Sequence, residues 1–322
     1  MELASIQDLS MKVKENIGQV IVGKENIVDL LLVGLISSGH VLLEDVPGTG
    51  KTLLAKSMAK SLSCTFKRIQ FTPDLLPTDV TGINFYNQKQ GEFEFRSGPI
   101  FANIVLADEI NRATPRTQSS LLESMEERQA TIDGETRKLE SPFMVIATQN
   151  PVESQGTFPL PEAQLDRFLL KINLGYPTKE EGIEILKRFK QTNPLEQINS
   201  VIDADDIVQA QQLYSSVYVS DDMFSYLMDI IDSTRSHPKV ELGVSPRGSQ
   251  ALLKAVQVFA ILQGRDFVTP DDIKAMVKPV LSHRLVIRQT MGLSGNIADK
   301  IIDEILESTT VPSEIELVKG RK

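Results

Sequence analysis

The sequence has little of what several classes of protein require. It contains no tryptophan, one cysteine (Cys64) and three histidines (His40, His237 and His283). A lone cysteine excludes an intrachain disulfide framework, and so few histidines leave no evident zinc cluster. No stretch approaches the roughly 20 apolar residues that a membrane-spanning helix needs. The charged, amphipathic N-terminus also lacks the apolar core of a signal peptide. We therefore expect a soluble, cytoplasmic protein.

An excess of positive charge is also missing. The formal net charge is −9 and the isoelectric point is near 5.1, which disfavours broad non-specific binding to nucleic acid. Hydrophobic content of 41% and charged content of 24% are typical of an ordinary globular protein. Because 322 residues exceed the usual size of one domain, we expect two.

The most informative stretch that is present is EDVPGTGKTL, at residues 44–53. A short apolar run precedes it and a helical pattern follows, which is the context of a phosphate-binding loop. Gly48 and Gly50 can take positive φ angles, so that consecutive backbone N–H groups turn toward an anion. Lys51 would reach the β- and γ-phosphates, and the Thr52 hydroxyl would bind Mg²⁺. The chain is therefore expected to bind a nucleoside triphosphate.

One position departs from the strict GxxxxGK[ST] pattern, because Asp45 stands where the first glycine is expected. The helix after the loop would still point its positive end at the phosphates. The residues predicted to contact the nucleotide here are Pro47, Gly48, Thr49, Gly50, Lys51, Thr52 and Leu53.

Two adjacent acids form the second motif. Asp108 and Glu109 end the apolar run of residues 104–107, and a buried strand would place both carboxylates at the sheet edge where open α/β sheets bind ligands. Asp108 would hold Mg²⁺, and Glu109 would orient and activate the attacking water. The alternative is a pair of solvated acids that cap the next helix, but the preceding phosphate loop favours the catalytic interpretation.

Three further polar residues are candidates for contacts with phosphate. Asn150 ends an apolar strand, where its amide could bind a γ-phosphate or the lytic water, although a polar turn before proline is common. Arg247 lies in the first turn of a helix, where the macrodipole disfavours a cation, so a phosphate contact is one explanation and a tolerated surface arginine is another. Arg167 ends a short helix, where it could meet the dipole or act as an arginine finger in a neighbouring subunit.

The pattern along the chain changes near residue 176. Before it, helices are expected within residues 1–38, 52–62 and 115–128, strands at 40–44, 66–71, 103–108 and 143–148, and hairpins at 83–97 and 130–139. After it, the chain is expected to be helical to its end, with N-caps at Thr178, Ser245 and Thr269. We therefore predict an α/β domain over residues 1–175 and a helical domain over 177–322.

These motifs, in this order, resemble the AAA+ ATPases and more narrowly the MoxR group. The segments EDVPGTGKT, LADEINR, ATQNP, LPEAQLDRF and SPRG recur there in the same arrangement, and the resemblance covers about residues 5–315. It implies an AAA+ P-loop NTPase core with a C-terminal all-helical lid. Residues 83–97 fit the insert that this group carries in its second helix, and residues 130–139 fit its extra hairpin.

The resemblance also implies roles for individual residues. Asn150 matches sensor 1, Arg247 matches sensor 2 and Arg167 matches the arginine finger, for which Arg112 and Arg116 are alternatives. The segment Val22-Gly23 matches the part that lines the adenine pocket, which implies ATP rather than GTP. Asp45 is tolerated in this group.

The function that the resemblance implies is Mg²⁺-dependent ATP hydrolysis coupled to chaperone-like remodelling or activation of partner proteins. It also implies a homo-oligomeric ring, usually a hexamer, and a partner with a von Willebrand A domain. Alternatives are a nucleic-acid motor, a chelatase-type motor subunit and a nucleotide-gated switch that hydrolyses rarely. The near-neutral charge of the two hairpins disfavours the nucleic-acid motor, since phosphate contacts need lysine and arginine.

Overall fold

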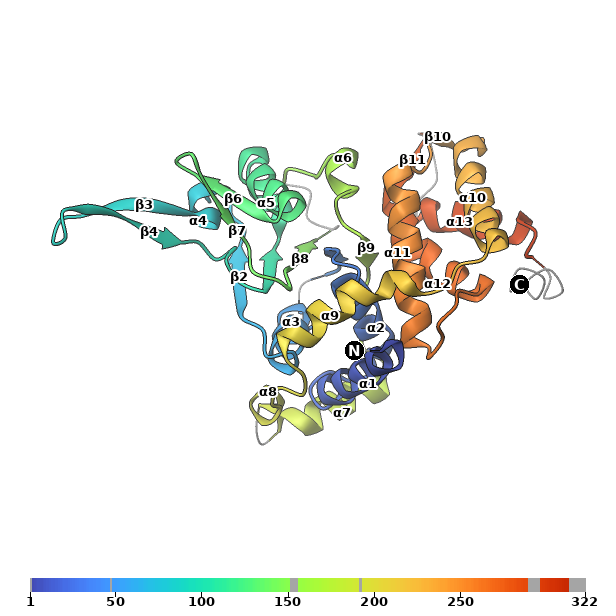
Figure 1. Cartoon of the computed structure of the whole chain (residues 1–322), viewed down its shortest axis with the longest axis horizontal. Coiled ribbons are helices and arrows are strands. Elements are labelled where there is room, and N and C mark those ends of the chain that lie inside the picture. Colours follow the sequence, from blue (N-terminus) through green and yellow to red (C-terminus); the bar gives the residue numbers. More distant parts are fainter. Residues whose placement is uncertain (1, 47, 151–155, 191–192, 289–295, 313–322) are drawn as a thin grey trace.

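The computed structural model describes residues 2–46, 48–150, 156–190, 193–288 and 296–312 (Figure 1). Its centre is a five-stranded parallel sheet in the order β2-β5-β8-β1-β9. The strands are β1 (Val41–Glu44), β2 (Phe66–Gln70), β5 (Ile104–Asp108), β8 (Met144–Gln149) and β9 (Leu170–Ile172). Four of these strands were predicted. The fifth, β9, was not, because three residues are too few for a recognisable pattern.

Both faces of this sheet are covered. Ile104 and Leu106 pack with the helices α1 (Leu3–Gly18), α2 (Glu25–Ile36) and α3 (Lys51–Ser61). Val105 and Ala107 point the opposite way, into a second core with α5 (Pro115–Glu127). A strand that is buried on both faces is apolar at every position, which explains the continuous apolar runs in the sequence.

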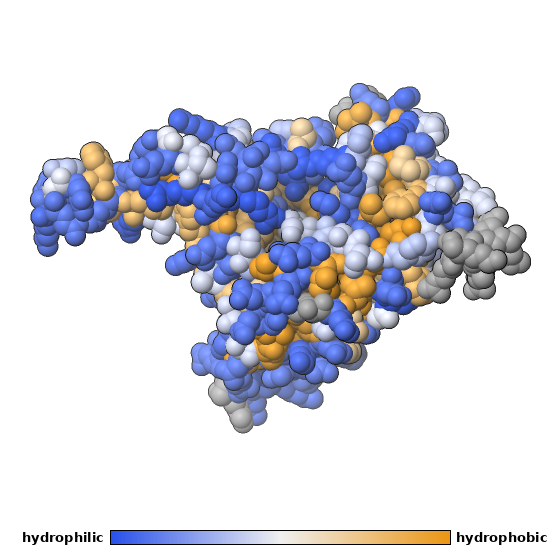
Figure 2. Space-filling model, viewed as in Figure 1, coloured by the Kyte–Doolittle hydropathy of each residue, from blue (hydrophilic) through white to orange (hydrophobic). Residues whose placement is uncertain are grey.

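Two hairpins leave the sheet region, and both were predicted. One pairs β3 (Gly82–Asn87) with β4 (Glu92–Ser97) and follows the short α4 (Pro77–Thr81), and the other pairs β6 (Gln129–Ile132) with β7 (Glu135–Lys138). Asp133 and Gly134 have φ angles of 51° and 86°, as a tight hairpin turn requires. The β3–β4 hairpin projects far from the body, and its largely polar surface is interrupted by apolar side chains (Figures 1 and 2).

The rest of the described chain is mainly helical. Its helices are α6 (Glu162–Leu165), α7 (Lys179–Phe189), α8 (Pro194–Gln197), α9 (Ala204–Leu213), α10 (Asp221–Ser236), α11 (Pro246–Leu262), α12 (Pro270–Leu281) and α13 (Ile297–Ser308), with 3-10 turns η1 (Ile110–Arg112), η2 (Tyr214–Ser216) and η3 (Ser282–Arg284). The predicted N-caps are present. The Thr178 and Ser245 hydroxyls accept from the N–H groups of Glu181 and Gly248, and Thr269 shares a capping box with Asp272.

The expectation of helix alone after residue 177 misses a small antiparallel sheet. It pairs β10 (Val240–Leu242) with β11 (Val286–Ile287), and such short strands leave no periodic signal. Helix α11 packs against α1 and α2, so the C-terminal helices rest on the N-terminal ones. Among the described helices, none combines the length and apolar character needed to cross a lipid bilayer.

Candidate functional site

The glycine loop joins β1 to α3 with the predicted backbone conformation. Gly48 and Gly50 have φ angles of 86° and 92°, and Gly50 is the residue that precedes α3. Space for a Cβ atom is open at both positions, so the left-handed conformation, and not crowding, requires glycine there. The Thr49 hydroxyl donates to the Val46 carbonyl at 3.3 Å, while Pro47 lies outside the described residues.

Asp45 has a clear structural role at the position where a glycine is usual. Its carboxylate is buried and accepts from the backbone N–H of Val46 at 2.8 Å and of Gly175 at 3.0 Å. The aspartate thereby ties the start of the loop to the segment that follows β9. Lys51 folds back on the same loop, where its Nζ donates to the carbonyls of Asp45 and Val46 at 3.0 Å each.

The predicted acids lie at the carboxyl edge of the sheet, beside the glycine loop. They share a cavity of about 430 Å³, called here the phosphate cavity. Its lining residues are Gly48, Gly50, Lys51, Thr52, Leu53, Arg68, Gln70, Asp108, Glu109, Thr148, Gln149 and Asn150. The structure therefore brings together the predicted loop, both acids and Asn150.

The side chains around Asp108 were not predicted. The Thr148 hydroxyl donates to Asp108 Oδ1 at 2.6 Å and accepts from the Glu109 N–H at 2.8 Å. Arg68 Nη2 lies 2.6 Å from Asp108 Oδ2 and also donates to the Gln70 side chain. Arg68 and Gln70 were missed because β2 carries polar residues on the way to the same edge, and only the strand register brings them to the acids.

Glu109 is held by its backbone and by its neighbours. Its φ angle of 56° is left-handed, a conformation that costs a non-glycine residue energy and is frequent at functional sites. The carboxylate oxygen Oε2 accepts from Gln70 Nε2 at 2.8 Å and pairs with Arg112 Nε at 3.0 Å. Arg112, one of the alternative fingers, thus contacts the acid of its own chain.

The oxygen atoms available here suit Mg²⁺. Thr52 and Asp108 line the same cavity, and Mg²⁺ is usually bound by one or two protein oxygens together with nucleotide phosphates. In the part of the chain that the structure describes, no group of three or more His, Cys, Asp or Glu residues could hold a metal ion by protein ligands alone. The residues therefore fit a metal that arrives with the phosphates.

A second cavity, of about 680 Å³, continues from the other side of the loop and is called here the base cavity. It shares Gly48, Gly50 and Leu53 with the phosphate cavity and is also lined by Val22. Helix α7 contributes Ile183 and Leu186, whose side chains are 45% and 74% exposed. An apolar surface beside a phosphate loop can receive a flat nucleobase, and α7 was not predicted to supply it.

Gly23 lies next to this cavity, in contact with α7. Its φ angle is 67°, and a Cβ atom there would stand 1.9 Å from the Glu181 carboxylate. The left-handed conformation therefore favours glycine, and a side chain here would have to displace the Glu181 side chain.

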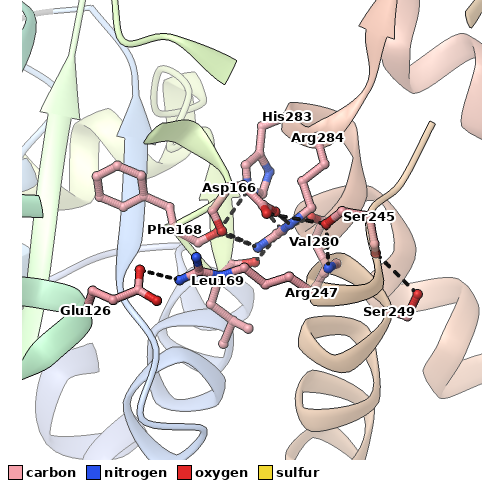
Figure 3. A network of polar contacts seen from close by, with 11 residues as sticks. Glu126, Asp166, Phe168, Leu169, Ser245, Arg247, Ser249, Val280, His283 and Arg284 are labelled. Atoms are coloured by element: carbon pink, nitrogen blue, oxygen red, sulfur yellow. Dashed lines mark hydrogen bonds and ion pairs between the residues drawn. The ribbon is translucent and has the colours of Figure 1, made fainter. Parts of the chain in front are cut away.

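Arg167 and Arg247 lie elsewhere. They line a third cavity of about 410 Å³, called here the arginine cavity, and neither is among the residues that line the phosphate cavity. Arg247 Nη2 lies 2.7 Å from Glu126 Oε2, and Arg167 Nε lies 3.7 Å from the same oxygen. Figure 3 shows Glu126 and Arg247 facing each other from α5 and α11.

The backbone around Arg167 is fixed by Arg284, which was not predicted. Arg284 is buried and donates to Asp166 Oδ1 at 2.6 Å and to the Phe168 and Leu169 carbonyls at 2.7 Å and 3.1 Å (Figure 3). Burial lowers the pKa of Arg284, while Asp166 opposes this shift. His283 contacts the Phe168 carbonyl at 2.9 Å, and its own burial holds its pKa well below 6.5.

Comparison with known proteins agrees with this architecture. Residues 40–170 match the model of the ATPase family associated with various cellular activities (AAA), and residues 232–305 match the AAA lid domain. The chain is 43% identical to Chaperone MoxR1 of Mycobacterium tuberculosis, with 91% of this chain and 80% of that protein aligned.

The chain belongs to the MoxR-type AAA+ ATPases. Two further similarities extend over nearly the full length of this chain. An uncharacterized Bacillus subtilis protein, YeaC, is 50% identical with 96% of both chains aligned. A crystal structure of a candidate ATPase from Cytophaga hutchinsonii has a TM-score of 0.87 at 37% identity, covering 97% of this chain and 100% of that one. Membership in the MoxR-type family implies nucleotide binding and confirms the predicted fold, an AAA+ core with a helical lid.

Proposed function

We propose that this chain is a Mg²⁺-dependent ATPase that hydrolyses ATP to ADP and phosphate and uses the reaction to remodel or activate partner proteins. The observation that carries this proposal is the phosphate cavity. One cavity is lined by a phosphate-loop lysine and threonine and by two adjacent acids at a sheet edge. Such a set suits phosphoryl transfer, which depends on positioning and charge compensation.

Each residue of the phosphate cavity has its own proposed role in binding or hydrolysis. The loop N–H groups and Lys51 would bind the β- and γ-phosphates, so Lys51 would leave the carbonyls of Asp45 and Val46. When bound, Mg²⁺ supplies positive charge beside the phosphates, with Thr52 and Asp108 as its protein ligands. Glu109 would orient the water and accept its proton, and Asn150 would hold the water or the γ-phosphate.

The base cavity supports the choice of adenine. Val22 and the apolar side of α7 would enclose the base, and Gly23 permits the close approach of α7. In this proposal the α/β unit of residues 1–175 supplies the phosphate cavity, and the helical unit of residues 177–322 supplies α7 and Arg247.

The arginine cavity supports a ring. Arg167 and Arg247 lie together but apart from the phosphate cavity of their own chain, so the γ-phosphate that they would contact belongs to a neighbouring subunit. Closed rings satisfy such head-to-tail contacts for every subunit. We therefore favour a homo-oligomer, a hexamer by family resemblance, that forms when ATP binds.

The remodelling role is supported by family resemblance and by the chaperone name of the Mycobacterium tuberculosis relative. By the same resemblance we propose a partner with a von Willebrand A domain, and from the amino-acid composition we propose a cytoplasmic location.

The variant Glu109→Gln tests the proposed activity. It should bind ATP as the unmodified chain does, while steady-state hydrolysis falls by roughly 100-fold or more. Glu123→Gln, a change at an exposed glutamate of α5, serves as the control and should leave hydrolysis unchanged. Undiminished phosphate release by the Glu109 variant would contradict the role of Glu109.

A further inference from the structure

The arginine cavity carries a charge arrangement that ATP hydrolysis alone does not explain. Glu126, near the end of α5, presents one carboxylate oxygen to two arginines from different parts of the chain. Arg167 comes from the segment between α6 and β9, and Arg247 comes from the first turn of α11. A carboxylate therefore occupies the space between two guanidinium groups that sequence resemblance assigns to phosphate.

Positive charge dominates the lining of this cavity. The cationic lining residues are Arg128, Arg167, Arg247, Lys254 and Arg284. The acidic lining residues in the described chain are Glu126 and Asp166, and Asp166 already accepts from Arg284 at 2.6 Å and from the Ser245 hydroxyl at 3.3 Å. Glu126 is thus the acid that compensates Arg167 and Arg247.

Arginine binds carboxylate and phosphate with the same planar set of N–H donors. An anion that reaches Arg167 and Arg247 must therefore compete with Glu126 for these donors. We propose that Glu126 is an internal counter-anion that compensates the charge of the two arginines in the free chain and is displaced from them by phosphate. This inference rests on the proposed function, in which a neighbouring subunit's γ-phosphate enters this cavity.

The contacts make such an exchange feasible. The Glu126 and Arg247 side chains are 33% and 47% exposed, and ion pairs with this exposure are weak. Arg167 also donates to the Leu122 carbonyl at 2.8 Å, and Arg284 fixes the backbone on both sides of it. These contacts hold Arg167 in the cavity after phosphate has displaced Glu126.

Tripolyphosphate binding to the full chain tests the proposal without any need for turnover or assembly. The background carries Lys51→Ala, which removes the main phosphate contact of the glycine loop, and calorimetry measures the remaining affinity. Adding Glu126→Gln should tighten binding roughly five-fold, because a neutral amide competes poorly for guanidinium groups. Glu127→Gln, the same change at the adjacent exposed residue, should leave the affinity unchanged.

A further variant shows whether tripolyphosphate binds in the arginine cavity. Adding Arg167→Gln and Arg247→Gln to the Lys51→Ala, Glu126→Gln chain should abolish the gained affinity. The proposal is overturned if Glu126→Gln leaves the affinity as the Glu127 control does, weakens it, or gives no detectable binding. The proposed ATPase activity is judged separately, by hydrolysis in the Lys51-containing chain, so the two ideas can fail independently.

Discussion

The phosphate cavity and the arginine cavity are compensated in opposite ways. In the phosphate cavity an arginine, Arg68, contacts Asp108, the acid proposed to bind the metal. In the arginine cavity an acid, Glu126, contacts Arg247 and lies near Arg167, the cations proposed to bind phosphate. In each cavity, the charged residue proposed to bind metal or phosphate is therefore already paired with a residue of opposite charge in the same chain. In the proposed ring, ATP with its metal would replace Arg68 as the partner of Asp108, and a neighbouring subunit's phosphate would replace Glu126.

Removing a cation from the arginine cavity should have the largest effect. Arg167→Ala should lower steady-state hydrolysis by about 1,000-fold, the scale of an arginine finger. ATP binding to the isolated chain should change less than about two-fold, because Arg167 does not line the phosphate cavity. Phosphate release and calorimetry with ATP measure the two quantities. Equal losses of binding and hydrolysis would instead place Arg167 at its own subunit's nucleotide.

The matching change in the phosphate cavity is Lys51→Ala. Nucleotide affinity should fall by about 100-fold, because a charge-assisted contact to two phosphates is lost. Lys56→Ala, at an exposed position of the same helix, serves as the control. Fluorescence titration with a labelled ATP analogue reports both affinities. A Lys51 variant that binds as tightly as the control would contradict the proposed phosphate contact.

Lowering the pH should destabilise the region around the arginine cavity before the rest of the molecule. His40 lines the arginine cavity, and its burial together with Arg128 lowers its pKa from 6.5 to about 3. His283, which contacts the Phe168 carbonyl, is lowered in the same direction by burial. Both are therefore neutral in the folded chain below pH 6.5, while the unfolded chain takes up protons there.

Because the unfolded state binds more protons between pH 6.5 and about 3, stability falls as the pH falls through this window. The free energy of unfolding should drop by about 1 kcal/mol per histidine between pH 7 and pH 5.5. Urea unfolding at the two pH values measures the sum. The protection of backbone amides, measured relative to unfolded peptide at each pH, should fall more around residues 166–169 than in the glycine loop. Equal protection at both pH values would contradict this account.

The smallest expected effect concerns Arg68. Arg68→Gln frees Asp108 from its ion pair, so the Mg²⁺ concentration at half-maximal ADP binding should fall by roughly three-fold. Lys67→Gln, at an exposed neighbour on the same strand, should leave this concentration unchanged. Calorimetric titrations at several Mg²⁺ concentrations give the values. A higher Mg²⁺ requirement in the Arg68 variant would mean that Arg68 supports the metal site and does not compete with it.

The two cavities also differ in how far the sequence predicts them. Lys51, Asp108 and Glu109 stand in short continuous motifs with a strand before them, so local pattern was enough to bring them to one edge of a sheet. Arg68, Gln70 and Thr148 reach the same edge through strand register, which pairs residues far apart in the chain. No local pattern contains that information.

The arginine cavity depends still more on distant contacts. Arg167 and Arg247 were recognised one by one, but their shared contact with Glu126 requires α5 to pack near the start of α11. Arg284, from η3, was missed because a buried arginine looks like any surface arginine in a sequence. The helices and N-caps were predicted well, since caps and helical periodicity are local, whereas β9, β10 and β11 are too short to leave a period.

The central claim is that one nucleotide site is built from two subunits, and mixing two inactive variants tests it most directly. Lys51→Ala lacks the phosphate contact but keeps the arginine cavity, and Arg167→Ala has the opposite defect. Hydrolysis should be near background for each variant alone and should rise well above the sum when the two are mixed with ATP and Mg²⁺. A mixture that hydrolyses ATP no faster than the sum of its parts would contradict the shared site.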